Sequence, residues 1–215
     1  MEAYITSISA GGIGEIIVTF DLRDGDKRCA SRFLISDGVY TELSLSVGLS
    51  TKYTYDAVER EAKIYAAYKK ALNLLSFSSS SRRALQLKLM KHGYEAEISL
   101  LVLERLEANG LLRENDFAIR EGERCLEKLW GERRIHAHLK EKGYSDEAVS
   151  GVFFAFEDMD VDFYENCLIL LKKKHSHLPK DKKELQKIIA SLMRYGYSLS
   201  QIKQAFKKME KLSDL

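Results

Sequence analysis

Apolar residues repeat in one pattern three times over the C-terminal two thirds of the chain. Each copy has a leucine, a glycine four residues later and then a tyrosine; the glycines are Gly93, Gly143 and Gly196, 50 and 53 residues apart. Further apolar residues stand four positions before each leucine and ten and thirteen positions after each glycine. They are Leu85, Leu103 and Leu106, then Ile135, Phe153 and Phe156, and finally Ile188, Phe206 and Met209. Because residues three or four apart share one helix face, each copy predicts two helices separated by a left-handed glycine.

The flanking segments complete these predicted units. A third helix is expected after the first copy, over residues 115–128, and after the second, over residues 162–174. Ser145, and either Ser198 or Ser200, are suited to cap the second helix of their copies. Each unit offers only one narrow apolar face, so three units must stack to bury it. We therefore predict three tandem three-helix repeats in an elongated array.

The first fifty residues follow a different pattern, in which β-branched and aromatic residues dominate short segments. Strands are predicted at Tyr4–Ile8, Ile16–Phe20 and Arg32–Ile35. Residues 11–14 form a glycine-rich, flexible connection, and Asp24-Gly25 is typical of a hairpin turn. The result is a small antiparallel meander, which needs a helix on one face to be stable. A helix predicted over residues 56–75 is suited to cover it.

A serine-rich stretch at residues 76–81 separates these two parts, since it interrupts the helical pattern and offers an N-cap for the next helix. The main domain boundary is therefore predicted near residue 76. The predicted fold class is mainly α, with a small N-terminal antiparallel β-sheet plus helix. The predicted domains are residues 1–76 for this extension, and residues 77–128, 129–176 and 177–215 for helical repeats 1, 2 and 3.

Composition supports a helical, cytoplasmic protein. Of 215 residues, 31% are charged and only Pro179 is a proline. A β-sandwich or barrel of this length would normally have more turn-forming residues. We expect no secretory signal, because residues 1–14 lack a basic segment and an apolar core. The longest uncharged stretch, Ala3–Gly14, is too short to cross a membrane. The cysteines are odd in number and widely spaced, as is typical of free thiols in a reducing cytosol. They are Cys29, Cys125 and Cys167.

The net charge of +2 hides an uneven distribution. Residues 172–211 carry 12 Lys or Arg against 3 Asp or Glu, whereas residues 151–166 carry five acids and no base. Residues 172–211 therefore differ in charge from the rest of the chain.

Basic residues are the strongest candidates for a binding function. Equivalent positions of successive repeats lie along one side of a stack, so their charges can form a stripe that binds nucleic acid or an acidic protein groove. For any single residue, a solvated helix face is the alternative. Few aromatic residues are interleaved, so we expect contacts to phosphates or carboxylates without base readout. The candidate partner- or DNA-binding residues are Arg82, Arg83, Lys88, Arg133, Arg134, Lys140, Lys142, Lys182 and Lys183.

No convincing catalytic motif is present. Gly12-Ile13-Gly14 lacks the third glycine and the lysine of a phosphate loop. The acids of residues 158–162 have the spacing that opens an EF-hand, but Phe163 and Ile169 replace its glycine and glutamate. We therefore expect a solvated linker that caps the next helix.

The histidines predict no metal site by their spacing. His136 and His138 point about 200° apart on a helix and cannot share an ion. His175 and His177 with Cys167 could bind zinc, but no second cysteine supports them. We expect no enzyme activity, no cofactor and no metal.

Three segments resemble the RecX family, the bacterial regulators of the RecA recombinase. In Gly131–Tyr144 a glycine precedes an Arg-Ile pair, a leucine four residues on and a Lys-Gly pair, as in the family signature. Ser81-Arg82-Arg83 is similar to the start of the family's first repeat. Residues 110–118 are similar to a further family segment, with Arg113-Glu114 where an acidic pair is usual. The resemblance covers residues 77–211.

The resemblance implies a non-enzymatic regulator with three tandem three-helix repeats in a curved, elongated domain. It also implies binding in the helical groove of the RecA filament, with interference in filament extension, ATP hydrolysis, strand exchange and coprotease activity. We therefore expect a cytoplasmic monomer that inhibits RecA in homologous recombination, DNA repair and the SOS response. Single- or double-stranded DNA is a further expected partner, and no membrane partner is expected. The alternative is a stand-alone nucleic-acid-binding module that uses the basic C-terminal region, including Lys172–Lys174, Lys180 and Lys187.

Overall fold

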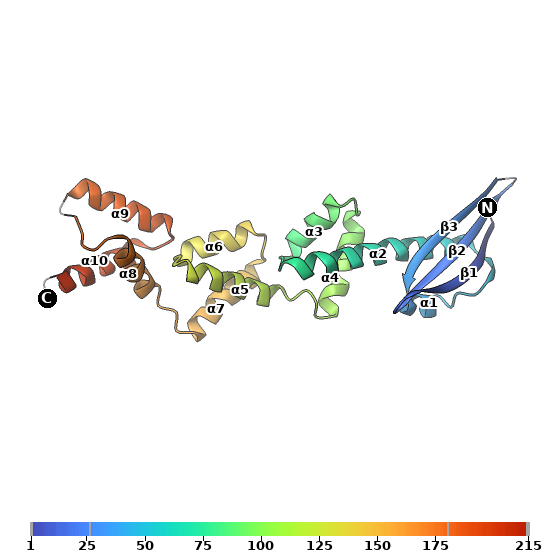
Figure 1. Ribbon diagram of the computed structural model, residues 1–215, viewed down its shortest axis with the longest axis horizontal. Helices are drawn as coiled ribbons and strands as arrows, with labels where there is room; N and C mark the ends of the chain where they lie inside the picture. Colours follow the sequence, from blue (N-terminus) through green and yellow to red (C-terminus); the bar gives the residue numbers. More distant parts are fainter. Residues whose placement is uncertain (1, 26, 180, 214–215) are drawn as a thin grey trace. The chain divides into compact units, whose positions relative to one another are not determined.

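The computed structural model describes residues 2–25, 27–179 and 181–213 (Figure 1), so Lys180 lies outside the described residues. Helices hold most of these residues, and strands occur only before residue 51, which confirms the predicted mainly α fold with a small N-terminal antiparallel sheet. The chain divides into two units: residues 1–78 with 85–112, and residues 79–84 with 113–215. No helix of the described part is long and apolar enough to cross a membrane.

The sheet belongs to the first unit and has the strand order β3-β2-β1-β4, with antiparallel pairing throughout. Its strands are β1 (Glu2–Gly12), β2 (Glu15–Asp24), β3 (Lys27–Ser36) and β4 (Gly48–Ser50). The predicted three-stranded meander is confirmed, and its strands are longer than the apolar pattern indicated. No sequence pattern indicated β4, because its three residues pair only with Ala3–Ile5 and are too few to show alternation.

Two helices cover one face of the sheet. They are α1 (Asp37–Glu42) and α2 (Lys52–Phe77). Val58 of α2 is fully buried in one apolar cluster with Phe20 and Ile35 of the sheet, which confirms the predicted helical cover. The helix begins earlier than its apolar pattern, because Thr51 Oγ1 accepts a hydrogen bond from Thr54 N (3.1 Å) and caps it.

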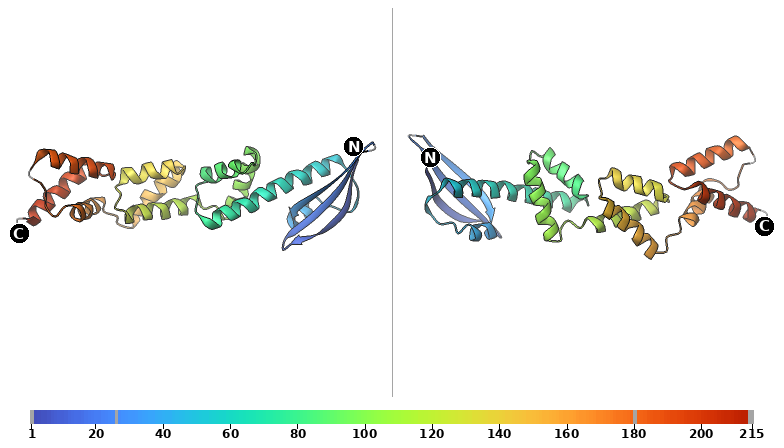
Figure 2. Two further views of the ribbon diagram at one scale, coloured as in Figure 1. Left: turned by 45° about the horizontal axis from the view of Figure 1, so that its top comes forward. Right: turned by 180° about the vertical axis from the view of Figure 1, so that it is seen from behind.

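The later turns of α2 belong to the first three-helix group, with α3 (Arg82–Lys91) and α4 (Ala96–Ala108). Ala67 and Ala71 of α2 are fully buried, and Arg105 of α4 forms an ion pair with Glu61 of α2 (3.0 Å). Figure 2 shows α2 as one continuous helix that starts beside the sheet and continues into the first three-helix group. One helix thus serves both the sheet and the first group.

The second unit contains two further three-helix groups with separate cores. The first consists of α5 (Glu114–Glu127), α6 (Glu132–Glu141) and α7 (Asp146–Asp158), and its core includes Leu139 and Phe156. The second consists of α8 (Phe163–Lys174), α9 (Lys182–Arg194) and α10 (Leu199–Ser213), and its core includes Leu192 and Phe206. Residues of the repeated apolar pattern thus form both cores.

The helix that completes each group comes before the glycine-containing pair, whereas the sequence pattern attached it to the end of the preceding pair. Residues 115–128 were expected to follow the first copy, but α5 packs on α6 and α7. Gly122 provides the physical reason, because a Cβ there would lie 2.6 Å from Val152 Cγ1 and 2.9 Å from Phe156 Cζ. Without a side chain at this position, α5 can approach α7 closely. The third group has the same order of helices, since α8 packs on α10, which follows it in the chain.

The predicted turns and caps of the helix pairs are confirmed. Gly93, Gly143 and Gly196 are left-handed, with φ of +90°, +81° and +98°. Ser145 Oγ accepts a hydrogen bond from Ala148 N (3.2 Å), and Ser198 Oγ accepts one from Gln201 N (3.2 Å). Ser198, and not Ser200, is therefore the cap in the third copy.

Candidate functional site

Two joints in the second unit hold the predicted arginines. In each, the residues at the start of a middle helix contact the glycine turn of the following group. The α6 joint consists of residues 131–134 and 195–197, and the α3 joint consists of residues 81–84 and 142–143.

Backbone atoms form the α6 joint. Gly131 N donates a hydrogen bond to Tyr195 O (2.7 Å), and Arg133 N donates one to Gly196 O (3.3 Å). A Cβ on Gly196 would lie 2.5 Å from Arg134 N, and a Cβ on Gly131 would lie 2.6 Å from the carbonyl carbon of Gly196. Both positions therefore need glycine, because any side chain would push the two backbones apart.

The α3 joint uses the equivalent acceptor with a different donor. Ser81 Oγ donates a hydrogen bond to Lys142 O (2.8 Å), the carbonyl directly before the turn glycine Gly143. Tyr195 O has the same place at the α6 joint. The Ser81 hydroxyl also accepts a hydrogen bond from Ala84 N (3.1 Å) and so caps α3. A side-chain hydroxyl thus does here what the amide of Gly131 does fifty residues later.

Glu114 holds the α3 joint from a second side. Its Oε1 accepts a hydrogen bond from Arg82 N (2.8 Å), and its Oε2 accepts one from Ser145 Oγ (2.9 Å). The carboxylate therefore links the first turn of α3 to the start of α7. Glu114 belongs to the Arg113-Glu114 pair, which stands where the family usually has two acidic residues. Of these two residues, Glu114 makes the contacts at the α3 joint.

The predicted arginines differ in their surroundings. Arg134 is half-buried, with its Cζ 3.9 Å from the ring centroid of Trp130 and 5.2 Å from that of Tyr195. Arg133 and Arg83 are exposed and form no ion pair with any described residue. The Arg134 side chain is thus part of the α6 joint, whereas Arg83 and Arg133 are accessible to a partner.

Replacing Arg134 with alanine should destabilise the second unit, while the same change at Arg133 should leave stability almost unchanged. The reason is the stacking on Trp130, since a cation–π contact at a partly buried site contributes about 1–2 kcal/mol. Trp130 is the only tryptophan of the chain, so its fluorescence during urea denaturation reports on this joint. Equal midpoints for the two variants would show that Arg134 does not hold the joint.

The predicted lysines are also in different surroundings. Lys140 and Lys142 form ion pairs with Asp146 (2.7 Å) and Glu121 (2.8 Å). Lys88 is half-buried on α3. The lysines that are exposed and form no ion pair with a described residue are Lys182 and Lys183, in the first turn of α9.

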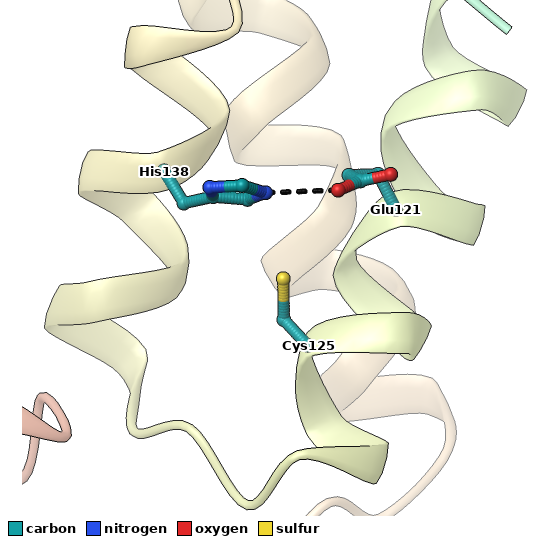
Figure 3. A group of neighbouring side chains, drawn as sticks. All are labelled: Glu121, Cys125 and His138. Carbon is teal, nitrogen blue, oxygen red and sulfur yellow. Dashed lines mark hydrogen bonds and ion pairs between the residues drawn. The ribbon is translucent and has the colours of Figure 1, made fainter.

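A buried cluster that no sequence pattern indicated lies between α5 and α6 (Figure 3). Glu121 and Cys125 stand one turn apart on α5, and His138 on α6 faces them, with the donor atoms of all three within 4.8 Å of one another. Glu121 Oε1 lies 2.8 Å from His138 Nε2 and 2.8 Å from Lys142 Nζ, and Oε2 lies 3.4 Å from Arg124 Nη1. The Cys125 sulfur points toward the space between the imidazole and the carboxylate.

Nearby cations keep the Glu121 carboxyl ionised. Burial alone would raise its pKa, but hydrogen bonds from Lys142 and His138 outweigh burial and lower the pKa below its ordinary value of 4.5. Burial, and then the charge of Glu121, raise the pKa of the Cys125 thiol. At neutral pH the cluster therefore combines a carboxylate with a protonated thiol.

The low pKa of Glu121 predicts a loss of stability in acid. The pKa of this carboxyl is lower in the folded chain than in the unfolded chain, so its ionised form stabilises the fold at pH values above the unfolded pKa of 4.5. This stabilisation is lost as the pH falls through the folded pKa. Glu121→Gln should therefore be less stable than the wild type at pH 7, with the difference shrinking below about pH 4. Urea midpoints at several pH values measure this difference. The same change at the exposed Glu127 of α5 controls for the loss of one negative charge from this helix.

The other histidines and acids singled out in the sequence have the following places in the structure. His136 stacks on Phe153, with ring centroids 6.3 Å apart, so it points away from His138 as predicted. Asp162 caps α8 by accepting a hydrogen bond from Tyr164 N (2.8 Å), as expected for the acidic linker. Among the described residues, only the Glu121 cluster brings three possible metal ligands together, so His175, His177 and Cys167 form no such group.

Two sequence models of one family match the chain. The RecX first three-helix domain matches residues 67–106, and the RecX third three-helix domain matches residues 160–206. The first range begins inside α2 and the second just before α8, so each includes residues of the leading helix of a group, in agreement with the packing. The regulatory protein RecX of Mycobacterium leprae (strain Br4923) is 31% identical over 135 residues, which are 61% of this chain and 78% of that protein. The chain belongs to the RecX family.

Further RecX proteins extend the comparison. The regulatory protein RecX of Halorhodospira halophila (strain DSM 244 / SL1) is 29% identical over 136 residues, 63% of this chain and 83% of that protein. The crystal structure of a regulatory protein RecX aligns with this chain with a TM-score of 0.72 and 20% identity. The alignment covers 94% of this chain and 99% of that chain. At this identity the likeness concerns the fold, and it extends over almost the whole chain.

Proposed function

We propose that this RecX-family chain is a non-catalytic cytoplasmic regulator that binds the RecA filament and inhibits it in homologous recombination, DNA repair and the SOS response. Membership of the RecX family carries this proposal, since the relatives are named as regulatory proteins. The Gly131–Tyr144 segment, on which the resemblance to RecA regulators rests, starts at the α6 joint.

The mechanism requires binding alone. A protein that binds across neighbouring protomers of the filament, or that occupies a growing end, changes the balance between addition and loss of protomers. Charge contacts along an exposed face favour fast association and make binding sensitive to salt. No chemical step is needed for either effect.

Arg83 and Arg133 are the contact residues that the geometry favours. They stand ten residues before Gly93 and Gly143, so they hold equivalent positions in successive copies. Both are exposed, and neither forms an ion pair with a described residue. Lys182 and Lys183 add exposed positive charge on α9. We therefore assign these four residues to the partner-binding face.

ATP hydrolysis by RecA tests the proposed function. Purified chain is added to preformed RecA filaments on single-stranded DNA, at ratios from substoichiometric to equimolar with RecA. We expect hydrolysis to fall, and to fall less as salt is raised, because charge contacts are screened. Unchanged hydrolysis at every ratio in low salt would refute the proposal.

A second candidate function is nucleic-acid binding without RecA. The observation that favours it is the density of exposed lysines before and on α9, with Lys172–Lys174 ahead of the helix and Lys182, Lys183 and Lys187 on it. Fluorescence anisotropy with labelled single- and double-stranded DNA distinguishes the two. Affinity that drops steeply as salt rises, with RecA hydrolysis unaffected, would favour this second function.

A further inference from the structure

The cluster between α5 and α6 offers one donor of each kind that zinc accepts in proteins: a carboxylate oxygen, a thiol sulfur and an imidazole nitrogen (Figure 3). Tetrahedral ligands about 2.0–2.3 Å from a zinc ion lie roughly 3.3–3.6 Å from one another. The donor atoms here lie within 4.8 Å, so side-chain movements of about 1 Å would suffice. We propose that Glu121, Cys125 and His138 form a binding site for Zn²⁺.

Cys125 provides an independent observation for this site. Its side chain is fully buried, and its thiol makes no hydrogen bond with any described residue. Its sulfur nevertheless points at the imidazole and the carboxylate. Cys167, the other buried cysteine, instead lies within an apolar cluster of the last group. The Cys125 thiol thus faces two polar groups without forming a hydrogen bond to either. A ligand of a metal ion placed between the three groups has this orientation.

The surroundings hold the three donors in place. Glu121 and Cys125 are four residues apart on one helix, so both project from the same face of α5. The rings of His138 and Trp130 pack at right angles to each other, with centroids 5.1 Å apart. The side chains of Glu121 and His138 are only 10% and 22% exposed, so little water competes with them for an ion. Fixed ligands in a partly dry site lower the cost of ordering them around a metal.

Lys142 is the competitor of the metal. Its ammonium lies 2.8 Å from Glu121 Oε1, but its side chain is 46% exposed and can move into water. Binding of Zn²⁺ would release the Lys142 ammonium to solvent and the thiol proton of Cys125 to the buffer. The proton on His138 Nε2 that bonds Glu121 would also leave this nitrogen, and in the neutral imidazole it moves to Nδ1. The two positive charges of the ion would then be balanced by the Glu121 carboxylate and the Cys125 thiolate. The three protein ligands leave a fourth position for water.

Cobalt titration tests the site directly, because a thiolate bound to Co²⁺ gives a charge-transfer band in the near ultraviolet. The titration is made in a Cys29→Ser background, since Cys29 is the exposed cysteine. We expect one equivalent of Co²⁺ to give the band and Zn²⁺ to displace it. Cys125→Ser and His138→Gln should remove the band. Their matched controls, Cys167→Ser and His136→Gln, should keep it.

Lys142→Met provides a test in which every proposed ligand is retained. Removal of the competing ammonium should tighten Zn²⁺ binding about fivefold, as expected for a partly exposed ion pair. Absence of the band in both the Cys29→Ser protein and its Lys142→Met derivative would overturn the proposal. A band that survives Cys125→Ser would overturn it as well. The readout involves no RecA, so the result is independent of the proposed function.

Discussion

Gly196→Ala should lower the unfolding free energy of the second unit by about 3 kcal/mol or more. An alanine would be strained by the φ of +98°, and its Cβ would lie 2.5 Å from Arg134 N. Relief of that clash separates the backbones and breaks the hydrogen bonds from Gly131 N to Tyr195 O and from Arg133 N to Gly196 O. Urea denaturation followed by Trp130 fluorescence measures the loss.

Two other glycines of the chain distinguish the two causes of this loss, the backbone strain and the steric clash at the α6 joint. Gly93 has φ +90°, and a Cβ at this residue would meet nothing within 4 Å, so Gly93→Ala should lose only the backbone strain, about 1–2 kcal/mol. Because Gly93 lies in the first unit, urea denaturation of this variant is followed by circular dichroism. Gly151 lies within α7 with equally open surroundings and no positive φ, so Gly151→Ala should be neutral or stabilising by up to about 1 kcal/mol. Equal losses for Gly196→Ala and Gly93→Ala would mean that the close approach at the joint contributes nothing.

Reversing the charges of Arg83 and Arg133 together should weaken inhibition of RecA hydrolysis by about tenfold or more, because both side chains would then repel an acidic partner. The exposed positions predict that the variant stays folded. The inhibitor concentration that halves ATP hydrolysis gives the effect, and circular dichroism checks the fold. This choice of residues avoids Arg134, whose loss would disturb the α6 joint itself.

A matched charge change controls for net charge. Lys27→Glu with Lys52→Glu changes the charge of the protein by the same amount, and both lysines are exposed in the first unit. This variant should inhibit as the wild type does. Inhibition that survives reversal at Arg83 and Arg133 would identify these side chains as solvated surface.

Local signals in the sequence predict the helix pairs well. The turn at Gly143 needs a left-handed residue, and the cap at Ser145 needs only its own hydroxyl and the amide of Ala148. Both depend on neighbours along the chain, so residue type and spacing are sufficient. The buried positions Leu139 and Phe156 follow from helix periodicity for the same reason.

Features that depend on residues far along the chain could not be predicted in this way. An apolar helix face does not indicate which neighbour covers it, and the position of α5 depends on Gly122 opposite Val152, thirty residues later. Arg134 is half-buried because Tyr195 of the next group lies beside it. Residue types at these positions are evident from the sequence, but the contacts between them are not.

The Glu121 cluster escaped prediction for a related reason. Its donors come from two helices, and a spacing of four residues, as between Glu121 and Cys125, is common on any amphipathic helix whether or not it binds a ligand. The only histidine near His138 in the sequence is His136, and its side chain points in another direction. The signal that the sequence does contain is an acid and a thiol on one face of a helix, followed by a histidine on the next helix.

The contact between Gly131 and Gly196 couples two positions that are 65 residues apart, since each glycine occupies the space in which the other's Cβ would lie. Once a side chain at residue 196 has opened the contact, a side chain at residue 131 should add little further strain. Selection on the two residues is therefore joint. A lineage that replaces Gly196 loses the reason to keep Gly131, whereas Gly196 still has a φ of +98° that favours glycine after Gly131 is lost.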